Sequence, residues 1–184
     1  NAATKADVDA VQVGGRNLAL NQSLNETVLG GYSTEWKEGV NLLSSIPLTG
    51  DEYVLSFEAK STVNGDIVHC YFYNPNTTTS AASSTGHLSS NGDGSCQVTL
   101  TSEWKRYWVK YKQSETTTKK RFIVGRRNPG FGSGSVSVRG IKLELGNKPT
   151  DWTPAPEDVP SALDYLATAI QDGSTDIEGG LINT

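Results

Sequence analysis

The sequence predicts an all-β fold, an antiparallel β-sandwich with a short helical tail before it and a C-terminal helix after it. Three observations indicate this fold. The chain has 184 residues, which suits one domain with a buried core. Hydrophobic residues make up only 35% of it and occur in short runs separated by glycine, serine and threonine, as in sandwiches with many turns. Within these runs apolar and polar residues alternate with the period of a strand.

Both ends of the chain have helical patterns. In residues 1–13, Val8 and Val11 lie three apart among good helix formers, which predicts the end of an upstream helix or linker, terminated by two glycines. Residues 159–173 are predicted to form a helix, with Ser161 and Asp164 as a capping box. Residues 174–184, where paired glycines separate Ile and Leu, are interpreted as the start of a further β element.

A first strand is expected in residues 14–23, where Leu18 and Leu20 alternate with small or polar residues, and a second in residues 40–48. The clearest alternation follows in residues 53–60. There one face is apolar and is predicted to meet the core. The Asn-Gly-Asp sequence at residues 64–66 predicts a hairpin turn, with residues 67–74 as the partner strand. That strand has two rows of side chains, one of Val68, Cys70 and Phe72 and the other of His69, Tyr71 and Tyr73.

A low-complexity connection at residues 74–95 separates these strands from the next, which are expected at 96–100, 105–113 and 121–126. The glycine-rich segment 130–134 is interpreted as a mobile loop at the rim of the sandwich, because no phosphate-binding signature accompanies it. In the last strand, residues 136–145, the apolar positions change phase. A β-bulge at Arg139–Gly140, with the glycine in the left-handed region, explains this change.

After that strand, residues 146–160 contain four prolines, which excludes a strand or helix interior. Trp152 is the large apolar side chain of this exit segment. We expect it to pack back on the sandwich and fix the path of the chain.

Composition and charge exclude several classes of function. The net charge of −4 and the isoelectric point near 5.2 argue against nucleic acid as a partner. No apolar stretch is long enough to insert into a membrane. A Ser-His-Asp triad would have to use His69 or His87, and no nucleophile-elbow motif is present. We therefore predict no catalytic residues, no cofactor and no enzyme activity.

The two cysteines, Cys70 and Cys96, lie in apolar strand-like runs. Neither has another Cys or His at zinc-ligand spacing, so no metal site is predicted from them. Two interpretations stay open at this point: a disulfide, or two buried thiols.

The row His69, Tyr71 and Tyr73 is the candidate ligand-binding face. Rings with polar tips can stack on a sugar and also form hydrogen bonds with its hydroxyl groups. Trp108 and Lys110 are expected to join this face if their strand lies beside it. The alternative is that a loop covers this face of the sheet and that the rings only pack beneath it.

Two segments resemble the bracketing motifs of a jelly-roll module found in tail and tail-fibre proteins of bacteriophages and prophages. They are VGGRNLALN at residues 13–21 and IKLELGNKPTDWTPAPED at residues 141–158. SEWKRYWVKY and RFIVG resemble its penultimate strands, so the resemblance covers residues 14–158. The module is similar to carbohydrate-binding jelly rolls of families 4, 9 and 22 within the galactose-binding-like sandwiches.

The resemblance implies a non-catalytic module of virion structure and host attachment, located in the virion tail, with cell-surface glycan and other tail-protein segments as partners. The runner-up is a carbohydrate-binding module of a secreted bacterial glycoside hydrolase. Tail fibres are commonly trimers, and a threefold axis would bury the apolar stripe of the C-terminal helix, which comprises Leu163, Leu166 and Ile170. The carbohydrate-binding relatives usually carry an Asp pair just before the final half of the last strand, and the second Asp helps to hold a structural calcium. Arg139 and Gly140 stand at the matching positions here, so no calcium site is expected.

Overall fold

The computed structural model describes residues 15–30, 39–44, 52–72, 78–86, 96–113, 121–126 and 132–160. These residues form nine strands and one short 3₁₀ helix, Pro156–Asp158. The strands are β1 (Thr27–Val28), β2 (Gly39–Leu43), β3 (Glu52–Ser61), β4 (Ile67–Phe72), β5 (Thr78–Ser83), β6 (Cys96–Thr99), β7 (Lys105–Gln113), β8 (Arg121–Gly125) and β9 (Val136–Leu145).

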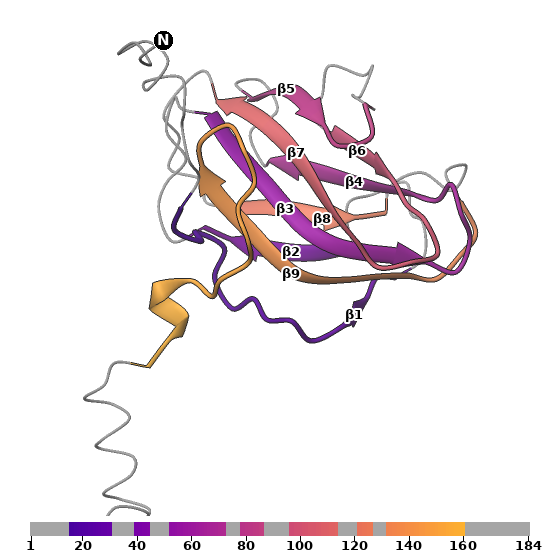
Figure 1. Ribbon diagram of the computed structural model, residues 1–184, viewed down its shortest axis with the longest axis horizontal. Coiled ribbons are helices and arrows are strands. Elements are labelled where there is room, and N and C mark those ends of the chain that lie inside the picture. Colours follow the sequence, from indigo (N-terminus) through magenta and orange to yellow (C-terminus); the bar gives the residue numbers. More distant parts are fainter. Residues whose placement is uncertain are drawn as a thin grey trace, which may run out of the picture.

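The strands form two antiparallel sheets that lie face to face (Figure 1). The larger sheet has the order β1-β9-β3-β7-β5 and the smaller sheet the order β2-β8-β4-β6. The all-β sandwich is thereby confirmed. The predicted tail at residues 1–13 and the predicted β element at 174–184 lie outside the described residues, as does the predicted helix 159–173 except for Val159 and Pro160. Val159 has an extended backbone.

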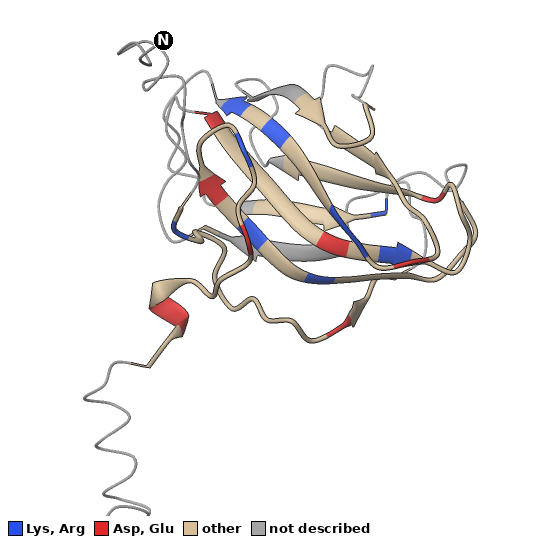
Figure 2. Ribbon diagram, in the orientation of Figure 1, with Lys and Arg blue, Asp and Glu red and all other residues tan. Residues whose placement is uncertain are grey.

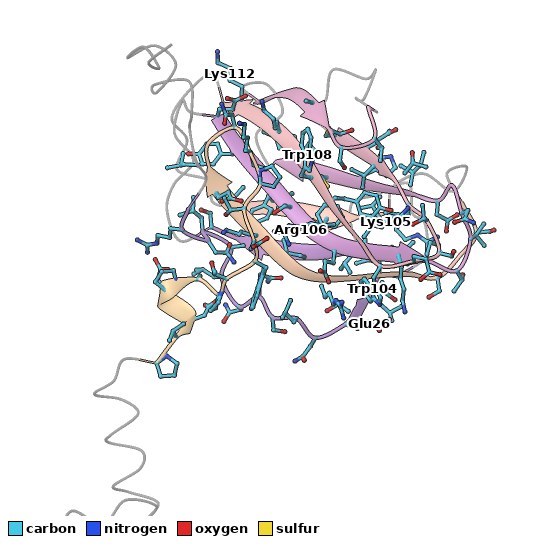
Figure 3. The ribbon with its side chains drawn as sticks, in the orientation of Figure 1. Glu26, Trp104, Lys105, Arg106, Trp108 and Lys112 are labelled. Atoms are coloured by element: carbon cyan, nitrogen blue, oxygen red, sulfur yellow. The ribbon has the colours of Figure 1, made fainter. Side chains whose placement is uncertain are left out.

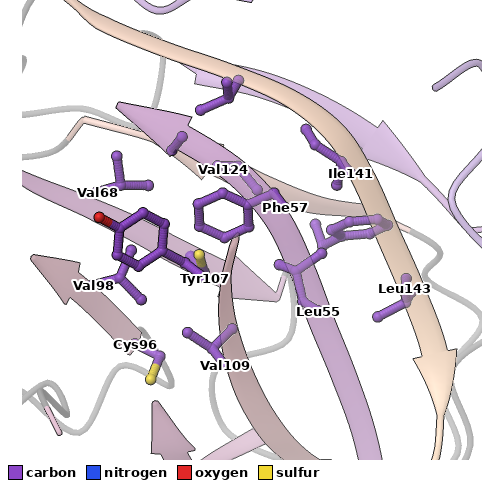
Figure 4. Packing of buried hydrophobic residues seen from close by; sticks show 14 of the residues in the cluster. Leu55, Phe57, Val68, Cys96, Val98, Tyr107, Val109, Val124, Ile141 and Leu143 are labelled. Carbon is purple, nitrogen blue, oxygen red and sulfur yellow. The ribbon is translucent and has the colours of Figure 1, made fainter. Parts of the chain in front are cut away.

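The core lies between the sheets and follows the predicted alternation of apolar residues. From the larger sheet, Leu55 and Phe57 of β3 and Val109 of β7 point inward, and from the smaller sheet Val68 and Val124 meet them (Figure 4). Each of these side chains is fully buried, which at about 25 cal/mol per Å² of apolar surface is the main stabilising term of such a sandwich.

The predicted hairpin at residues 64–66 is wrong. β3 belongs to the larger sheet and β4 to the smaller one, so residues 62–66 cross between the sheets. Gly65 has the positive φ of 94° that the Asn-Gly signal predicts. The local turn signal was therefore correct, but it could not show that both neighbours of β3 are distant strands, β7 and β9.

The predicted bulge in β9 is confirmed. Ser56 of β3 pairs with Lys142 and Glu58 pairs with Arg139, so Gly140 and Ile141 together oppose one residue of β3. Gly140 has a φ of 55°, in the left-handed region. The extra residue lets Arg139 and Lys142 both face outward, opposite outward residues of β3.

The exit segment also follows the prediction. Trp152 Nε1 donates a hydrogen bond of 3.3 Å to the carbonyl of Ile141, and the indole lies 3.6 Å from the position that a Cβ on Gly140 would occupy. Trp152 therefore packs on the bulge and fixes the chain where it leaves β9.

The described part of the glycine-rich segment, from residue 132 on, is hydrogen-bonded to the crossover that follows β3. The buried carboxylate of Asp66 accepts hydrogen bonds from the N–H groups of Ser133, at 3.3 Å, and of Gly134, at 2.9 Å. A Cβ on Gly134 would come within 2.5 Å of Ser61 Oγ, so only glycine allows this approach.

Candidate functional site

The structure divides the predicted binding residues between the two outer faces of the sandwich. His69 and Tyr71 lie on β4 of the smaller sheet, whereas Trp108 and Lys110 lie on β7 of the larger sheet. The neighbours of β7 are β3 and β5, so the condition for adding Trp108 and Lys110 to the row on β4 is not met. Tyr73 lies outside the described residues.

On the smaller sheet, His69 is only 3% exposed although its strand position points away from the core. Its Nε2 lies 3.1 Å from Gln97 Nε2 of β6. Ile123, which opposes Tyr71 on β8, is 2% exposed. The outer face of this sheet is therefore covered around His69, and only Tyr71 of this row is partly accessible among the described residues.

The outer face of the larger sheet carries charges of both signs (Figure 2). Four residues of β7 point outward along its length, with Lys112 at the end of the row, and Trp104 precedes the row on the same side (Figure 3). The other three residues of the row are Arg106, Trp108 and Lys110. They oppose Glu58, Ser56 and Val54 of β3, which in turn oppose Arg139, Lys142 and Glu144 of β9.

The exit segment covers the β9 side of this face through buried charges. The carboxylate of Glu144 accepts hydrogen bonds from the N–H group and the hydroxyl of Thr150, at 2.9 and 2.6 Å. Lys142 Nζ donates to Thr150 Oγ1 at 2.6 Å and to the carbonyl of Asp151 at 2.8 Å. Lys142 and Glu144 are 1% and 0% exposed. Both charges therefore hold the exit segment and are not accessible to a ligand.

Arg106 connects the exit segment to the part of this face that lies around Trp108. Its Nη2 donates to Ser56 Oγ at 2.7 Å and to the carbonyl of Thr150 at 2.9 Å. Partial burial lowers the pKa of the Arg106 guanidinium, and the carboxylates nearby, Glu144 foremost, act in the opposite direction. Arginine stays charged in proteins. The result is a cation with a fixed position beside Trp108.

Two cations of the protein lie over the ring of Trp104. Arg139 Cζ lies 4.3 Å and Lys60 Nζ 4.8 Å from the ring centroid, which is cation–π geometry. Arg139 Nε also donates a 2.6 Å hydrogen bond to Glu58. Trp104 therefore anchors cations of the sheet surface.

Trp108 differs from Trp104. It is half-buried, and within the described residues no ring or cation is stacked on its indole. Arg106 lies on one side along β7 and Lys110 on the other, and Lys110 Nζ lies 3.3 Å from Glu52 Oε1. Trp108 can therefore offer an aromatic face with cations and a carboxylate nearby, a chemistry suited to hydroxyl-rich ligands.

Sequence reasoning found Trp108 and Lys110 but missed Trp104 and Arg106. The signal was present, since residues 104, 106, 108 and 110 alternate with the inward-facing Tyr107 and Val109. Neither the pairing with β3 nor the cations on Trp104 could be read from this spacing, because both depend on distant strands.

Metal-ligating groups do not converge within the described ranges, where no cluster of three or more His, Cys, Asp or Glu is found. Arg139 lies beside a polar pocket of about 120 Å³ between residues 21–27 and β9. The lining of this pocket includes the side chains of Arg139 and several amides but no carboxylate. In the same described ranges, no helix is long and apolar enough to cross a membrane.

No protein-family model matches the chain, and no curated protein matches it. Among solved structures, it is similar to the tripod from the baseplate of bacteriophage Tuc2009, at 20% identity and a TM-score of 0.44, over 89% of this chain and 66% of that one. This chain therefore matches less than two thirds of the length of that tripod chain.

The chain is also similar to the N-terminal cellulose-binding domain of Cellulomonas fimi β-1,4-glucanase C, at 12% identity and a TM-score of 0.43, over 72% of this chain and 90% of that one. A third structure is a putative sugar-binding protein from Bacteroides thetaiotaomicron, at 14% identity and a TM-score of 0.36, over 74% and 90%. The solved structures similar to this chain therefore include a phage baseplate protein and carbohydrate-binding domains. Because these TM-scores are below 0.5, the function proposed below is based on the residues of this chain.

Proposed function

We propose that the chain is a non-catalytic glycan-binding module of a phage or prophage tail protein, and that it binds glycan through the outer face of β7. The observation that carries this proposal is Trp108, a half-buried indole without a stacked partner among the described residues, placed between Arg106 and Lys110. The motifs at residues 13–21 and 141–158 support the tail protein as its context.

The groups around Trp108 suit a neutral or weakly charged sugar. The apolar face of a sugar ring stacks on an indole, while its hydroxyl groups take hydrogen bonds from the surroundings. Arg106 is already held by Ser56 and Thr150, and Lys110 is held by Glu52. Because these side chains are fixed before the ligand arrives, binding costs less conformational entropy.

The carboxylates of this face support binding over catalysis. Glu144 is fully buried and bonded to Thr150, Glu58 is bonded to Arg139, and Glu52 is paired with Lys110. Glycoside cleavage needs one carboxyl group that protonates the leaving oxygen and a second that attacks or activates water. Each of these carboxylates is already engaged by a hydroxyl group or a cation of the protein, so none of them is placed to act on a bound sugar.

A glycan array with the whole chain tests the proposal, followed by titration calorimetry on the best ligand. Trp108→Ala is expected to weaken binding roughly tenfold or more, which is about 1.4 kcal/mol and within the range of aromatic contacts. Tyr71→Ala is the matched control, since it removes a partly exposed ring from the opposite face. Loss of binding in Tyr71→Ala with full binding in Trp108→Ala would place the site on β4 and contradict the proposal.

The array also distinguishes a tail protein from the runner-up, a carbohydrate-binding module of a secreted glycoside hydrolase. A tail protein is expected to prefer glycans of bacterial surfaces, and an accessory module is expected to prefer the polysaccharide that its hydrolase degrades. Retention of plant polysaccharides alone would favour the runner-up. If the chain retained no glycan of either kind, the binding role itself would be wrong.

A further inference from the structure

Cys70 and Cys96 face each other across two neighbouring strands. Cys70 lies on β4 and Cys96 on β6, and the register of this antiparallel pair places the two residues directly opposite. Opposed residues of antiparallel strands have Cα atoms about 4.5–5.5 Å apart, within the range of about 4.4–6.8 Å that disulfides require. Both side chains are fully buried, in the core between the sheets.

The chain between the two cysteines includes β5, which ends the strand order of the larger sheet and lies near β6 (Figure 1). After β4 it crosses to the larger sheet, where it forms the edge strand β5, and it then returns to form β6 at the edge of the smaller sheet. β5 and β6 contact each other, and Cys96 Sγ lies 3.7 Å from the carbonyl oxygen of Ala82 in β5. The segment from Cys70 to Cys96 therefore contains β5 and ends at the first residue of β6, and these two edge strands together form the β5–β6 edge of the sandwich.

The two strands that carry the cysteines are held unequally. β4 lies between β8 and β6 in its sheet, and the Tyr111 hydroxyl of β7 donates a hydrogen bond to the carbonyl of Cys70 across the core. β6 spans only Cys96–Thr99 and, among the strands that the structure describes, pairs within its sheet with β4 alone. A short strand at an edge is the part of a sheet that opens most easily.

We propose that Cys70 and Cys96 form a cross-strand disulfide under oxidising conditions, and that this bond closes the β5–β6 edge of the sandwich. The two thiols are not joined by a disulfide bond in this structure. The inference depends on the register and topology of the strands and is independent of the glycan-binding proposal.

The reaction is a thiol–disulfide exchange with a low-molecular-weight disulfide such as oxidised glutathione. The thiolate of one cysteine attacks glutathione disulfide, forming a mixed disulfide and releasing one glutathione thiolate. The second cysteine, as its thiolate, then attacks the protein sulfur of the mixed disulfide and releases the second glutathione. In total the protein loses two protons and two electrons, and one glutathione disulfide becomes two reduced glutathiones.

Burial makes this reaction slow in the closed sandwich. Desolvation, and the Cys96 thiol beside it, raise the pKa of Cys70 well above its ordinary value, so Cys70 is protonated at neutral pH. Attack on the oxidant therefore requires β6 to open first. Oxidation is expected to be complete when the chain refolds with oxidised glutathione, and slower, with a rate that rises with pH, when the folded protein is treated.

The test compares the reduced and oxidised forms of the whole chain by mass spectrometry and thermal unfolding. Oxidised protein is expected to lose the mass of two hydrogen atoms and to yield one cross-linked peptide that contains both cysteines. Its Tm is expected to exceed that of the reduced form by about 5–10 °C, from the usual stabilisation by a disulfide in a domain of this size. Hydrogen exchange of the β6 amides should slow in the same sample.

The control is the double variant Cys70→Ala/Cys96→Ala, whose Tm is expected to be the same with and without oxidant. Comparing each protein with itself removes the effect of the truncated side chains. Three results would overturn the proposal: both thiols remain alkylatable after oxidation, each cysteine retains a glutathione, or covalent dimers form. An intramolecular bond that leaves the Tm unchanged would refute its role in closing the edge.

Discussion

Asp66 offers the sharpest test of how the sandwich is held together. Its carboxylate is 1% exposed and lies where the crossover from β3 meets the glycine-rich segment. It accepts hydrogen bonds from Ser61 Oγ at 2.6 Å and from the N–H groups of Gly134 and Ser133 at 2.9 and 3.3 Å. Arg126 Nη2 lies 3.9 Å from it. One side chain thus joins the crossover, the segment before β9 and the residue after β8.

Asp66→Ala is expected to destabilise the fold by about 3–5 kcal/mol. A hydrogen bond to a charged group contributes about 1.5–3 kcal/mol, and a buried N–H left without an acceptor costs about 1–3 kcal/mol. Counting only the two shorter bonds, from Ser61 and Gly134, gives the expected range. It is a large share of the roughly 5–15 kcal/mol that stabilises a typical domain, and it lowers the Tm by about 10–15 °C.

Urea unfolding followed by tryptophan fluorescence, with thermal unfolding in parallel, measures this loss. Asp66→Asn keeps one acceptor oxygen and is expected to fall between the wild type and Asp66→Ala. Asp151→Ala removes an exposed carboxylate and serves as the control, with an expected change within about 0.5 kcal/mol. A loss below about 1 kcal/mol in Asp66→Ala would refute the reasoning, because the Ser61 hydroxyl and the buried N–H group of Gly134 would then have other acceptors.

Three further predictions concern packing and assembly. Gly134→Ala is expected to cost about 1–3 kcal/mol in urea unfolding, because its Cβ would come within 2.6 Å of the Asp66 carboxylate, whereas Gly15→Ala, with nothing within 4 Å, should be neutral. Thr150→Val removes a hydroxyl that donates to buried Glu144 and should lower stability by about 1–3 kcal/mol, while Thr150→Ser restores it. The proposed trimer predicts threefold mass in light scattering for the whole chain and a monomer without residues 159–184; a monomer in both would contradict it.

The approximate positions of most strands followed from sequence, because alternation with a period of two reports which residues leave water. The inward row of β3 and the bulge at Gly140 were both predicted in this way and confirmed. The expectation of an exposed connection over residues 74–95 was wrong, since β5 (Thr78–Ser83) pairs there with β7; its run of threonine, serine and alanine carries no apolar alternation. Local turn chemistry was less informative. It predicted the positive φ of Gly65 but assigned β4 as the hairpin partner of β3, because a turn signal carries no information on pairing with distant strands.

The candidate site could be predicted only in part, and for the same reason. Alternation correctly put Trp108 and Lys110 outside the core. Whether they lie beside His69 depended on strand order, and β7 and β4 belong to different sheets, so these residues lie on opposite faces of the sandwich. Sequence alone showed that Trp108 was a candidate platform. The tertiary structure determined that Trp104 already carries two cations and that Arg106 is fixed by Thr150.

The sequence by itself determined the class of the fold, the bulge and the exit anchored by Trp152, because each depends on alternation or backbone conformation over a few residues. Only the tertiary structure decided which strands share a sheet, which charges are buried and which cysteines oppose each other. These features arise from contacts between residues far apart in the chain, such as Asp66 with Gly134 and Cys70 with Cys96. Short-range patterns do not encode such contacts, since many sheet orders are compatible with the same alternation.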